Sequence, residues 1–242
     1  MNYKITLAYD GTDYHGWQLQ EELPTIQLAL NRAVARLAGA PVIVHGAGRT
    51  DAGVHAEGQV VSFHLTKEWT GQALCRALNG NLPRDIRVLA AEPVDDEFHA
   101  RFSAKEKTYR YQIYNAPVMN PLLARFAWHF PYSLDLEKLV SNGQALLGMH
   151  DFTAFTVADC ETRTHVRELT SFSLEQQASL LQLYFTGKGF LRYQVRTMVM
   201  ALLELNRGRI AMTMPKLIAS QKRELIRGTA PAQGLTLLAI EY

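Results

Sequence analysis

Residues 46–55 read GAGRTDAGVH, and they place two ionisable side chains inside a glycine-rich turn. Arg49 and Asp51 are separated by one residue, and glycines stand close on both sides. In such a turn an aspartate commonly accepts hydrogen bonds from nearby backbone N–H groups, as an Asx turn. The alternative is that the turn holds Asp51 for chemistry.

Two motif-based hypotheses for this turn fail on their context. A dinucleotide-binding loop needs glycine or alanine at the third motif position and a helix after it, but Asp51 occupies that position and residues 59–65 (QVVSFHL) alternate like a strand. A zinc deaminase would match HAE at 55–57, but no P-C-x-x-C follows in the sequence. The Asx turn and a catalytic carboxylate both remain open.

The composition is that of an ordinary globular protein. The chain has 242 residues, 48% of them hydrophobic, and its apolar runs are far shorter than a membrane helix. Residues 1–10 lack the pattern of a secretory signal, and the two cysteines, Cys75 and Cys160, have no metal-type spacing. We therefore expect a reduced, cytoplasmic protein that neither spans a membrane nor binds a metal.

The formal net charge is only +2, but basic residues alternate with aromatic residues in two segments, 101–111 and 188–196. The basic members are Arg101, Lys105, Lys107, Arg110, Lys188, Arg192 and Arg196, and the aromatic members are Phe102, Tyr109, Tyr111, Phe190 and Tyr193. Such segments can hold a phosphate backbone and stack bases. Solvated strand and helix faces have the same composition, so nucleic-acid binding is one of two interpretations.

The first half of the chain has the order of a β-α-β-β-α-β unit. Apolar alternation predicts strands at 3–9, 42–45, 59–65 and 86–94. Thr25 is the predicted N-cap of the first helix, and Thr70 opens the second. The turn with Asp51 connects the two middle strands.

The second half repeats this order of elements without repeating the sequence. Strands are expected at 107–115, 166–174, 179–185 and 235–242, with helices from 136 to a stop at Gly148 and from 190 to 205. The sequence therefore predicts an α+β fold of two ferredoxin-like β-α-β-β-α-β units, residues 1–104 and 105–242. Their sheets would be mainly antiparallel, with a basic cleft between the units.

Five segments resemble the tRNA pseudouridine synthase A family. GRTDAGVHA (48–56) is similar to the signature of the family's catalytic loop. The others are YDGTDYHGWQ (9–18), FHARFSAKEKTYRYQIYN (98–115), GKGFLRYQVRTMV (187–199) and TAPAQGLTLLAIEY (229–242). The segments follow the family order over nearly the whole chain, which makes the resemblance specific.

The resemblance implies an isomerase that converts uridine to pseudouridine at positions 38, 39 and 40 of the tRNA anticodon stem-loop. It also implies a homodimer that holds each tRNA across both subunits, without a metal or an organic cofactor. The reaction breaks the N1–C1′ bond, turns the uracil and rejoins it through C5. Nothing is oxidised or hydrolysed, so one carboxylate is enough, whereas a glycosidase needs two.

The resemblance also assigns roles to single residues. Asp51 matches the essential aspartate and would act at the ribose as nucleophile or base. Tyr109 matches the active-site tyrosine, on which a flipped uracil would stack. Arg196 would keep the aspartate ionised, Arg49 would help extrude the nucleotide or hold its phosphate, and Leu235 would cover the base. Tyr109 and Leu235 could instead be core residues of their strands.

Two neighbours of Arg196 depart from the family pattern. Gln194 stands where methionine is common and Met200 where glycine is common. Both flank Arg196, so we expect them to affect helix packing more than chemistry. The eight histidines show no metal spacing, and His55 is expected to support the loop.

Two rival functions share most of these features. A non-catalytic RNA-binding protein would use the same basic segments, but it would gain nothing from a carboxylate that faces RNA phosphates. A pseudouridine synthase with a different RNA target would share the loop, and only the segments outside the loop argue against it.

Overall fold

The computed structural model describes residues 1–157 and 162–242. The chain divides into two compact units, one of Met1–Lys105 with Thr236–Tyr242 and one of Glu106–Leu235. The sequence predicts units at 1–104 and 105–242, whereas in the structure Thr236–Tyr242 group with the first unit. Cys160 lies outside the described residues.

The first unit has the β-α-β-β-α-β order that its sequence predicts. Its elements are β1 (Asn2–Tyr9), α1 (Ile26–Ala38), β2 (His45–Gly46), β3 (His55–His64), α2 (Gly71–Asn79), β4 (Ile86–Val94) and most of β10 (Leu235–Glu241). β1 lies between β4 and β3 and is antiparallel to both, and β2 is antiparallel to β3. The strand order β4-β1-β3-β2 is that of a ferredoxin-like unit.

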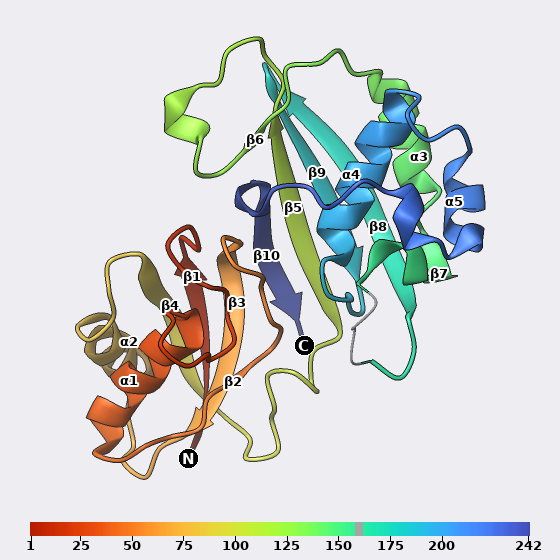
Figure 1. Cartoon of the computed structure of the whole chain (residues 1–242). Helices are drawn as coiled ribbons and strands as arrows, with labels where there is room; N and C mark the ends of the chain where they lie inside the picture. The colour runs from red at the N-terminus through yellow and green to blue at the C-terminus, as the bar shows by residue number, and fades with distance from the viewer. Residues whose placement is uncertain (158–161) are drawn as a thin grey trace. The chain divides into compact units, whose positions relative to one another are not determined.

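The predicted helix caps of the first unit are confirmed. The Thr25 side chain accepts a hydrogen bond from the amide of Leu28, and Thr70 accepts one from Ala73, so each satisfies an N–H group that the first helical turn leaves without a partner. Figure 1 shows the two helices, α1 and α2, side by side. The unit's core combines buried helix residues with alternate residues of β1 (Tyr3, Ile5, Leu7, Leu30, Val34, Leu74 and Leu78).

The strand predicted at 42–45 is much shorter in the structure. Only His45 and Gly46 pair with β3, opposite Ser62 and Val61, while the Ile43 side chain is 75% exposed. The beginning of β3, at His55 and Ala56, pairs with another strand. β10 pairs there in parallel, with Thr236 opposite His55 and Leu237 opposite Ala56. This pairing explains why the last residues belong with the first unit.

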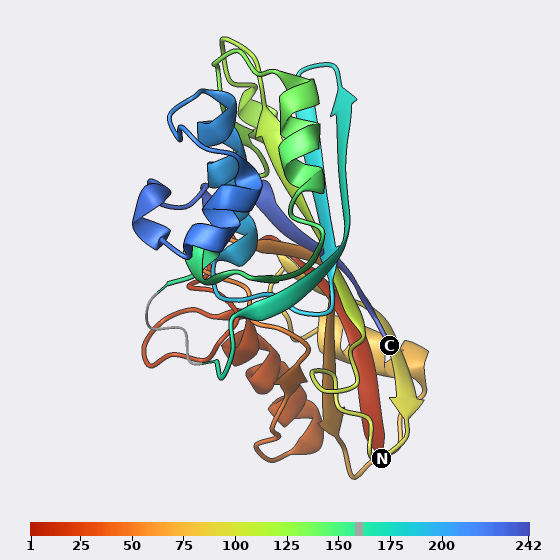
Figure 2. The ribbon, with the colours of Figure 1, turned by 90° about the vertical axis from the view of Figure 1, so that its right-hand side faces the viewer.

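The described residues of the second unit form a mainly antiparallel sheet and three α-helices. Its elements are β5 (Glu106–Tyr114), β6 (Trp128–His129), α3 (Leu136–Gln144), β7 (Gly148–Asp151), β8 (Val166–Gln177), β9 (Leu180–Gly187), α4 (Gln194–Asn206) and α5 (Met214–Ser220), with 3-10 turns at Pro121–Leu123, Thr153–Phe155, Arg223–Leu225 and Ala232–Gly234. β9 pairs antiparallel with β5 and β8, and β7 with β8. Of the strands described in this unit, only β6 pairs in parallel, with β5. The long β8–β9 hairpin and helices α3 and α4 stand out in Figure 2. The predicted α+β class with mainly antiparallel sheets is confirmed.

Two predicted helices of the second unit have different ends. α3 stops at Gln144, and Gly148, with a φ of 96°, begins β7 rather than ending the helix. α4 begins at Gln194 and not at residue 190, because Tyr193 has a left-handed φ of 62° that no helical residue adopts. In the part of the chain that the structure describes, no helix combines the length and the apolar character needed to cross a membrane.

Candidate active site

The turn that carries Asp51 connects β2 to β3 in the first unit. Thr50 is buried, Asp51 is partly buried and Arg49 is exposed. The backbone carbonyl of Asp51 accepts a hydrogen bond of 3.1 Å from the amide of Val54, and Gly53 has a φ of 77°. This backbone hydrogen bond helps to close the turn.

Two buried polar side chains support the turn from the sheet below it. The Tyr9 hydroxyl, on β1, lies 2.8 Å from the Thr50 hydroxyl. The Gln59 side chain, on β3, donates a 2.9 Å hydrogen bond to the carbonyl of Gly48. Burial raises the pKa of Tyr9 to about 12, although hydrogen bonds with Thr50 and Gln59 oppose the shift. Tyr9 thus stays neutral and fixes the residue just before Asp51.

The loop after β1, residues 10–17, holds the turn from the side. The amide of Trp17 donates to the carbonyl of Thr50 at 3.0 Å, and the amide of Gly53 donates to the carbonyl of Tyr14 at 3.2 Å. Gly16 has a φ of 88°, and a Cβ at this position would lie 2.8 Å from the Thr50 carbonyl oxygen. Only glycine allows this close approach, so the two loops can pack backbone against backbone.

His55 ties the end of the turn to the same loop. Its Nδ1 atom lies 3.0 Å from the backbone nitrogen of Gly11 and 3.2 Å from a carboxylate oxygen of Asp10. One Nδ1 atom cannot accept from Gly11 and donate to Asp10 at the same time. The amide of Gly11 always carries its proton, so we assign Nδ1 as its acceptor. His55 supports the loop, as the sequence predicts.

Tyr109 lies on β5 of the second unit, and its side chain is 7% exposed. Its ring contacts the Phe190 ring edge to face, with 5.1 Å between the ring centroids. On the same face of the strand, Tyr111 is fully buried and its hydroxyl donates to the carbonyl of Pro231 at 2.7 Å. Burial raises the pKa of Tyr111 well above its ordinary value, against the opposing charge of Arg196.

Arg196 lies in the first turn of α4. Its Nε atom donates a 2.8 Å hydrogen bond to the carbonyl of Ala230, whose own amide donates to the carbonyl of Arg196 at 3.1 Å. These bonds clamp the segment before Leu235 to the helix, and Leu235 itself is 5% exposed. Gln194 is fully buried, and its side-chain oxygen accepts from the amide of Leu191 at 2.8 Å, so this departure from the family pattern caps the turn before α4.

The structure brings part of the predicted site together. Arg49 and Asp51 share one supported turn in the first unit, while Tyr109, Arg196 and Leu235 belong to the second unit. The predicted influence of Arg196 on Asp51 stays a prediction. Within residues 1–157 and 162–242, no cluster of three or more His, Cys, Asp or Glu side chains could hold a metal ion.

The chain resembles known proteins over most of its length. A family model described as tRNA pseudouridine synthase matches residues 5–103 and 143–242, which include the turn, both its supports, Arg196 and Leu235. The chain belongs to the tRNA pseudouridine synthase family. This is a family of isomerases.

Curated relatives of this synthase match over nearly their whole length. The tRNA pseudouridine synthase A of Methylacidiphilum infernorum (isolate V4) is 43% identical over 244 residues, covering 100% of this chain and 96% of that protein. Those of Acetivibrio thermocellus and Moorella thermoacetica are each 41% identical over 242 residues, covering 100% and 99% of this chain and 99% and 98% of the relatives.

Sequence reasoning assigned no role to the residues that support the turn of this synthase. They are Tyr9, Gly11, Gly16, Trp17 and Gln59. A signal for some of them was present: the segment YDGTDYHGWQ places glycines five residues apart around polar and aromatic side chains, which is unusual for a plain connection. Gln59 gave no signal, because a glutamine on a predicted strand is ordinarily solvent-exposed, whereas here it is fully buried.

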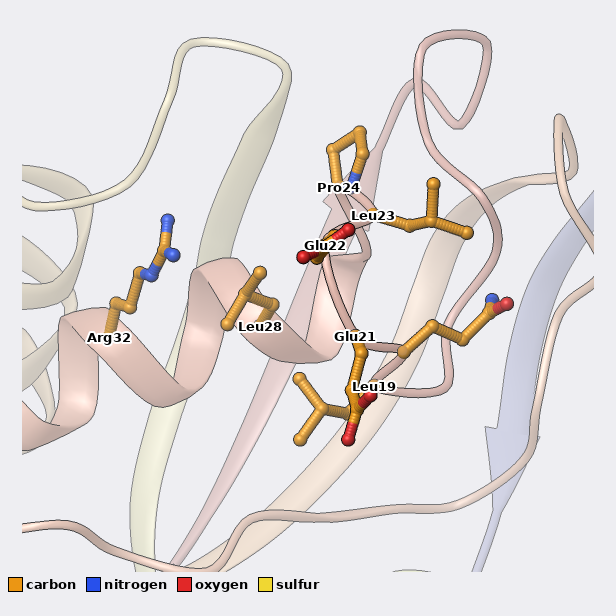
Figure 3. Close-up of a pocket in the computed structure, with 8 residues that line it drawn as sticks. Leu19, Glu21, Glu22, Leu23, Pro24, Leu28 and Arg32 are labelled. Carbon is orange, nitrogen blue, oxygen red and sulfur yellow. The ribbon is translucent and has the colours of Figure 1, made fainter.

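A shallow pocket of about 450 Å³ lies elsewhere on the first unit of the synthase (Figure 3). The lining comes from α1 and the loop before it (Leu19, Gln20, Glu21, Glu22, Leu23, Pro24, Leu28 and Arg32). None of the predicted site residues lines it. Its lining includes the carboxylates of Glu21 and Glu22, which would repel a phosphate backbone.

Proposed function

We propose that this synthase converts uridine to pseudouridine at positions 38, 39 and 40 of the tRNA anticodon stem-loop, with Asp51 as its catalytic residue. The observation that carries the proposal is the support of the Asp51 turn. Tyr9, Gln59 and the loop 10–17 fix the backbone on both sides of this carboxylate. A turn that only reversed the chain would need no buried hydrogen-bond network beneath it.

The chemistry needs one carboxylate at the ribose. The N1–C1′ bond breaks, the uracil turns while it stays bound, and a bond forms between C5 and C1′. N1 gains a proton and C5 loses its hydrogen to solvent, so the atoms balance without any external oxidant or water. Asp51 acts at the ribose, as nucleophile or as base. A rigid turn serves this role because a catalytic group that is already positioned avoids an entropic cost during reaction.

The remaining residues are proposed to bind the substrate. Tyr109 stacks on the flipped uracil, and Leu235 covers the base. Arg196 keeps the Asp51 carboxylate ionised, since a nearby cation favours the charged form. Arg49, exposed on the turn two positions before Asp51, helps to extrude the nucleotide or holds its phosphate.

We further propose that the synthase works in the cytoplasm as a homodimer, needs neither metal nor organic cofactor, and holds tRNA across both subunits. Arg101 in the first unit and Lys188 in the second are exposed. Basic residues in both units suit a long anionic partner. Sedimentation of the purified protein tests the dimer: a monomer that is fully active on tRNA would contradict it.

The variant Asp51→Asn tests the catalytic assignment. Asparagine has nearly the same shape and keeps an oxygen that can accept hydrogen bonds, so the turn should persist. It can neither act as nucleophile nor take a proton, so tritium release from C5-labelled uridine in tRNA should fall to background. Filter binding at fixed salt should show equal or slightly tighter binding, because one negative charge has been removed.

Glu57→Gln is the matched control for Asp51→Asn. Glu57 is an exposed carboxylate six residues further along the chain, on β3, and its change removes the same charge. The control should keep turnover. Near-normal turnover in a folded Asp51→Asn protein would refute the proposal, and equal losses in both variants would point to charge alone.

Chemical mapping of pseudouridine tests the positions. tRNA transcripts with a single anticodon-arm uridine at 38, 39 or 40 should each be modified, and a transcript whose uridines lie only in other arms should not. Modification of that last transcript would show a synthase with a different RNA target. Stoichiometric binding without modification of any transcript would favour the non-catalytic alternative.

A further inference from the structure

Tyr193 precedes α4 in a backbone conformation that aromatic residues rarely adopt. Its φ is 62° and its ψ is 1°, in the left-handed region. The N-cap residues of the four other α-helices in the described chain are extended instead (Thr25, Thr70, Asp135 and Thr213). A residue other than glycine in the left-handed region is strained, and such strain persists where the surrounding structure requires it.

The side chain of Tyr193 does not cap α4. Its side chain makes no capping hydrogen bond, whereas Thr25 and Thr70 each cap their own helices. The side chain of Gln194 accepts from the amide of Leu191, which lies in the turn before α4 and not in its first helical turn. The contacts of the tyrosine ring offer a reason for the conformation.

The ring of Tyr193 contacts two guanidinium groups. The Arg196 Cζ atom lies 5.2 Å from the ring centroid, and the Arg192 Cζ atom lies 5.0 Å from it. An Nη atom of Arg192 also donates to the Tyr193 hydroxyl at 3.3 Å. Both distances are within the range in which a cation is attracted to an aromatic face.

Arg196 is held at a second point by the backbone. Its Nε atom donates to the carbonyl of Ala230, and the amide of Ala230 returns a bond to the Arg196 carbonyl. The Tyr193 ring adds an aromatic contact to this backbone hydrogen bond. The Arg196 guanidinium therefore has both a backbone partner and an aromatic partner.

We propose that Tyr193 is a positioning residue for Arg196. The left-handed turn places the ring against the guanidinium, so that the charge of Arg196 is fixed where the substrate site needs it. The inference rests on the proposed function only for its kinetic consequence, since the contact itself does not depend on the reaction. Tyr193 acts through Arg196 and need not touch the RNA.

Three variants of Tyr193 separate the effect of the aromatic ring from the effect of the strained backbone. Tyr193→Phe keeps the aromatic face, and Tyr193→Leu keeps bulk and the same strained backbone but loses the face. Tyr193→Gly removes the ring and adopts a positive φ without strain. Ala178→Gly is the matched control, because Ala178 also has a positive φ, 51°, in the β8–β9 turn. It should relieve strain without changing activity.

We expect Tyr193→Phe to stay within about twofold of the parent kcat, and the Leu and Gly variants to lose about tenfold, which corresponds to about 1.4 kcal/mol. KM for tRNA should change by less than about twofold, because phosphate contacts dominate binding. The acid limb of the pH profile of kcat/KM should move to higher pH in the Leu and Gly variants, since a displaced arginine lowers the pKa of the aspartate less.

A measurement without substrate separates this inference from the proposed function. Solvent exchange of the Arg196 Nε proton, followed by ¹⁵N NMR, should be slow in the parent and in Tyr193→Phe and faster in Tyr193→Leu. Slow exchange with normal kcat in Tyr193→Leu would overturn the inference, as would equal loss in the Phe and Leu variants. Absence of turnover in the parent would remove the proposed function, while the exchange rates would still decide the role of Tyr193.

Discussion

Replacing Gly16 by alanine tests whether the loop 10–17 sets the position of Asp51. The added Cβ would lie 2.8 Å from the Thr50 carbonyl oxygen and 3.1 Å from both the Ala52 nitrogen and the Asp51 carbonyl carbon. An ordinary contact begins at 3.4 Å, so the Thr50 carbonyl would have to retreat by about 0.6 Å. The variant therefore moves the backbone on both sides of the Asp51 carboxylate, which is proposed to be catalytic.

Two costs follow from this change. The left-handed conformation of residue 16 costs about 1–2 kcal/mol once a side chain is present. This is a fraction of the roughly 5–15 kcal/mol that stabilises a typical domain, so the protein should still fold. Displacement of a catalytic group by about 1 Å can cost about 100-fold in rate, so a shift of about 0.6 Å should lower kcat by about 10- to 100-fold.

Gly39→Ala is the matched control for the backbone cost. Gly39 ends α1 with a φ of 72°, and a Cβ there would meet nothing within 4 Å. Both variants should lose a similar amount of stability in urea unfolding, but only Gly16→Ala should lose turnover in the tritium-release assay, with tRNA affinity unchanged. Parental kcat in a folded Gly16→Ala protein would refute the view that this loop positions Asp51.

Three further outcomes are expected. Tyr109→Ala should abolish turnover while most tRNA affinity stays, because stacking on one base is worth about 1–3 kcal/mol; a fully active variant would make Tyr109 a core residue only. The pKa of Tyr9 is near 10 in the unfolded chain and about 12 in the folded protein. Its contribution to the free energy of unfolding is therefore complete below pH 10. About 2–3 kcal/mol of that free energy is lost as the pH rises to 12. Urea titrations should show a shallower alkaline loss in Tyr9→Phe, and parallel curves would contradict this. Arg101→Ala and Lys105→Ala should each reduce the salt dependence of tRNA binding by a slope of about 1, and unchanged slopes would mean that both are only solvated surface.

Local signals predicted the fold of the first unit well. Thr25 and Thr70 mark the starts of α1 and α2 because their hydroxyl groups accept hydrogen bonds from amides of the first helical turn. Each threonine and its hydrogen-bond partner lie within four consecutive residues. β1 and β4 follow from alternation alone. The extent of β2 was not predictable in this way, because VIVH has strand propensity, but only His45 and Gly46 pair with β3 and pairing depends on tertiary structure.

The candidate site also has some features that the local sequence predicts and others that depend on tertiary packing. Asp51 and Arg49 are candidates because they stand in a glycine-rich turn, which is visible within ten residues, and because GRTDAGVHA resembles the family's catalytic loop. The burial of Gln59 beneath Gly48, and the contact of Tyr193 with Arg196, depend on tertiary packing and on a backbone angle. Neither leaves a pattern in the sequence, since propensity and periodicity describe average residues and not a single strained one.

The parallel pairing of β10 with β3 makes the order of synthesis matter to this enzyme. A ribosome produces β3 and the Asp51 turn early, but Thr236 and Leu237 emerge only after the whole of Glu106–Leu235. Until then the β3 edge at His55 and Ala56, next to the turn, has exposed strand groups that another chain could pair with. The first unit thus completes its sheet after the second has been made, and a nascent chain cannot complete the sheet beside the Asp51 turn before β10 is made.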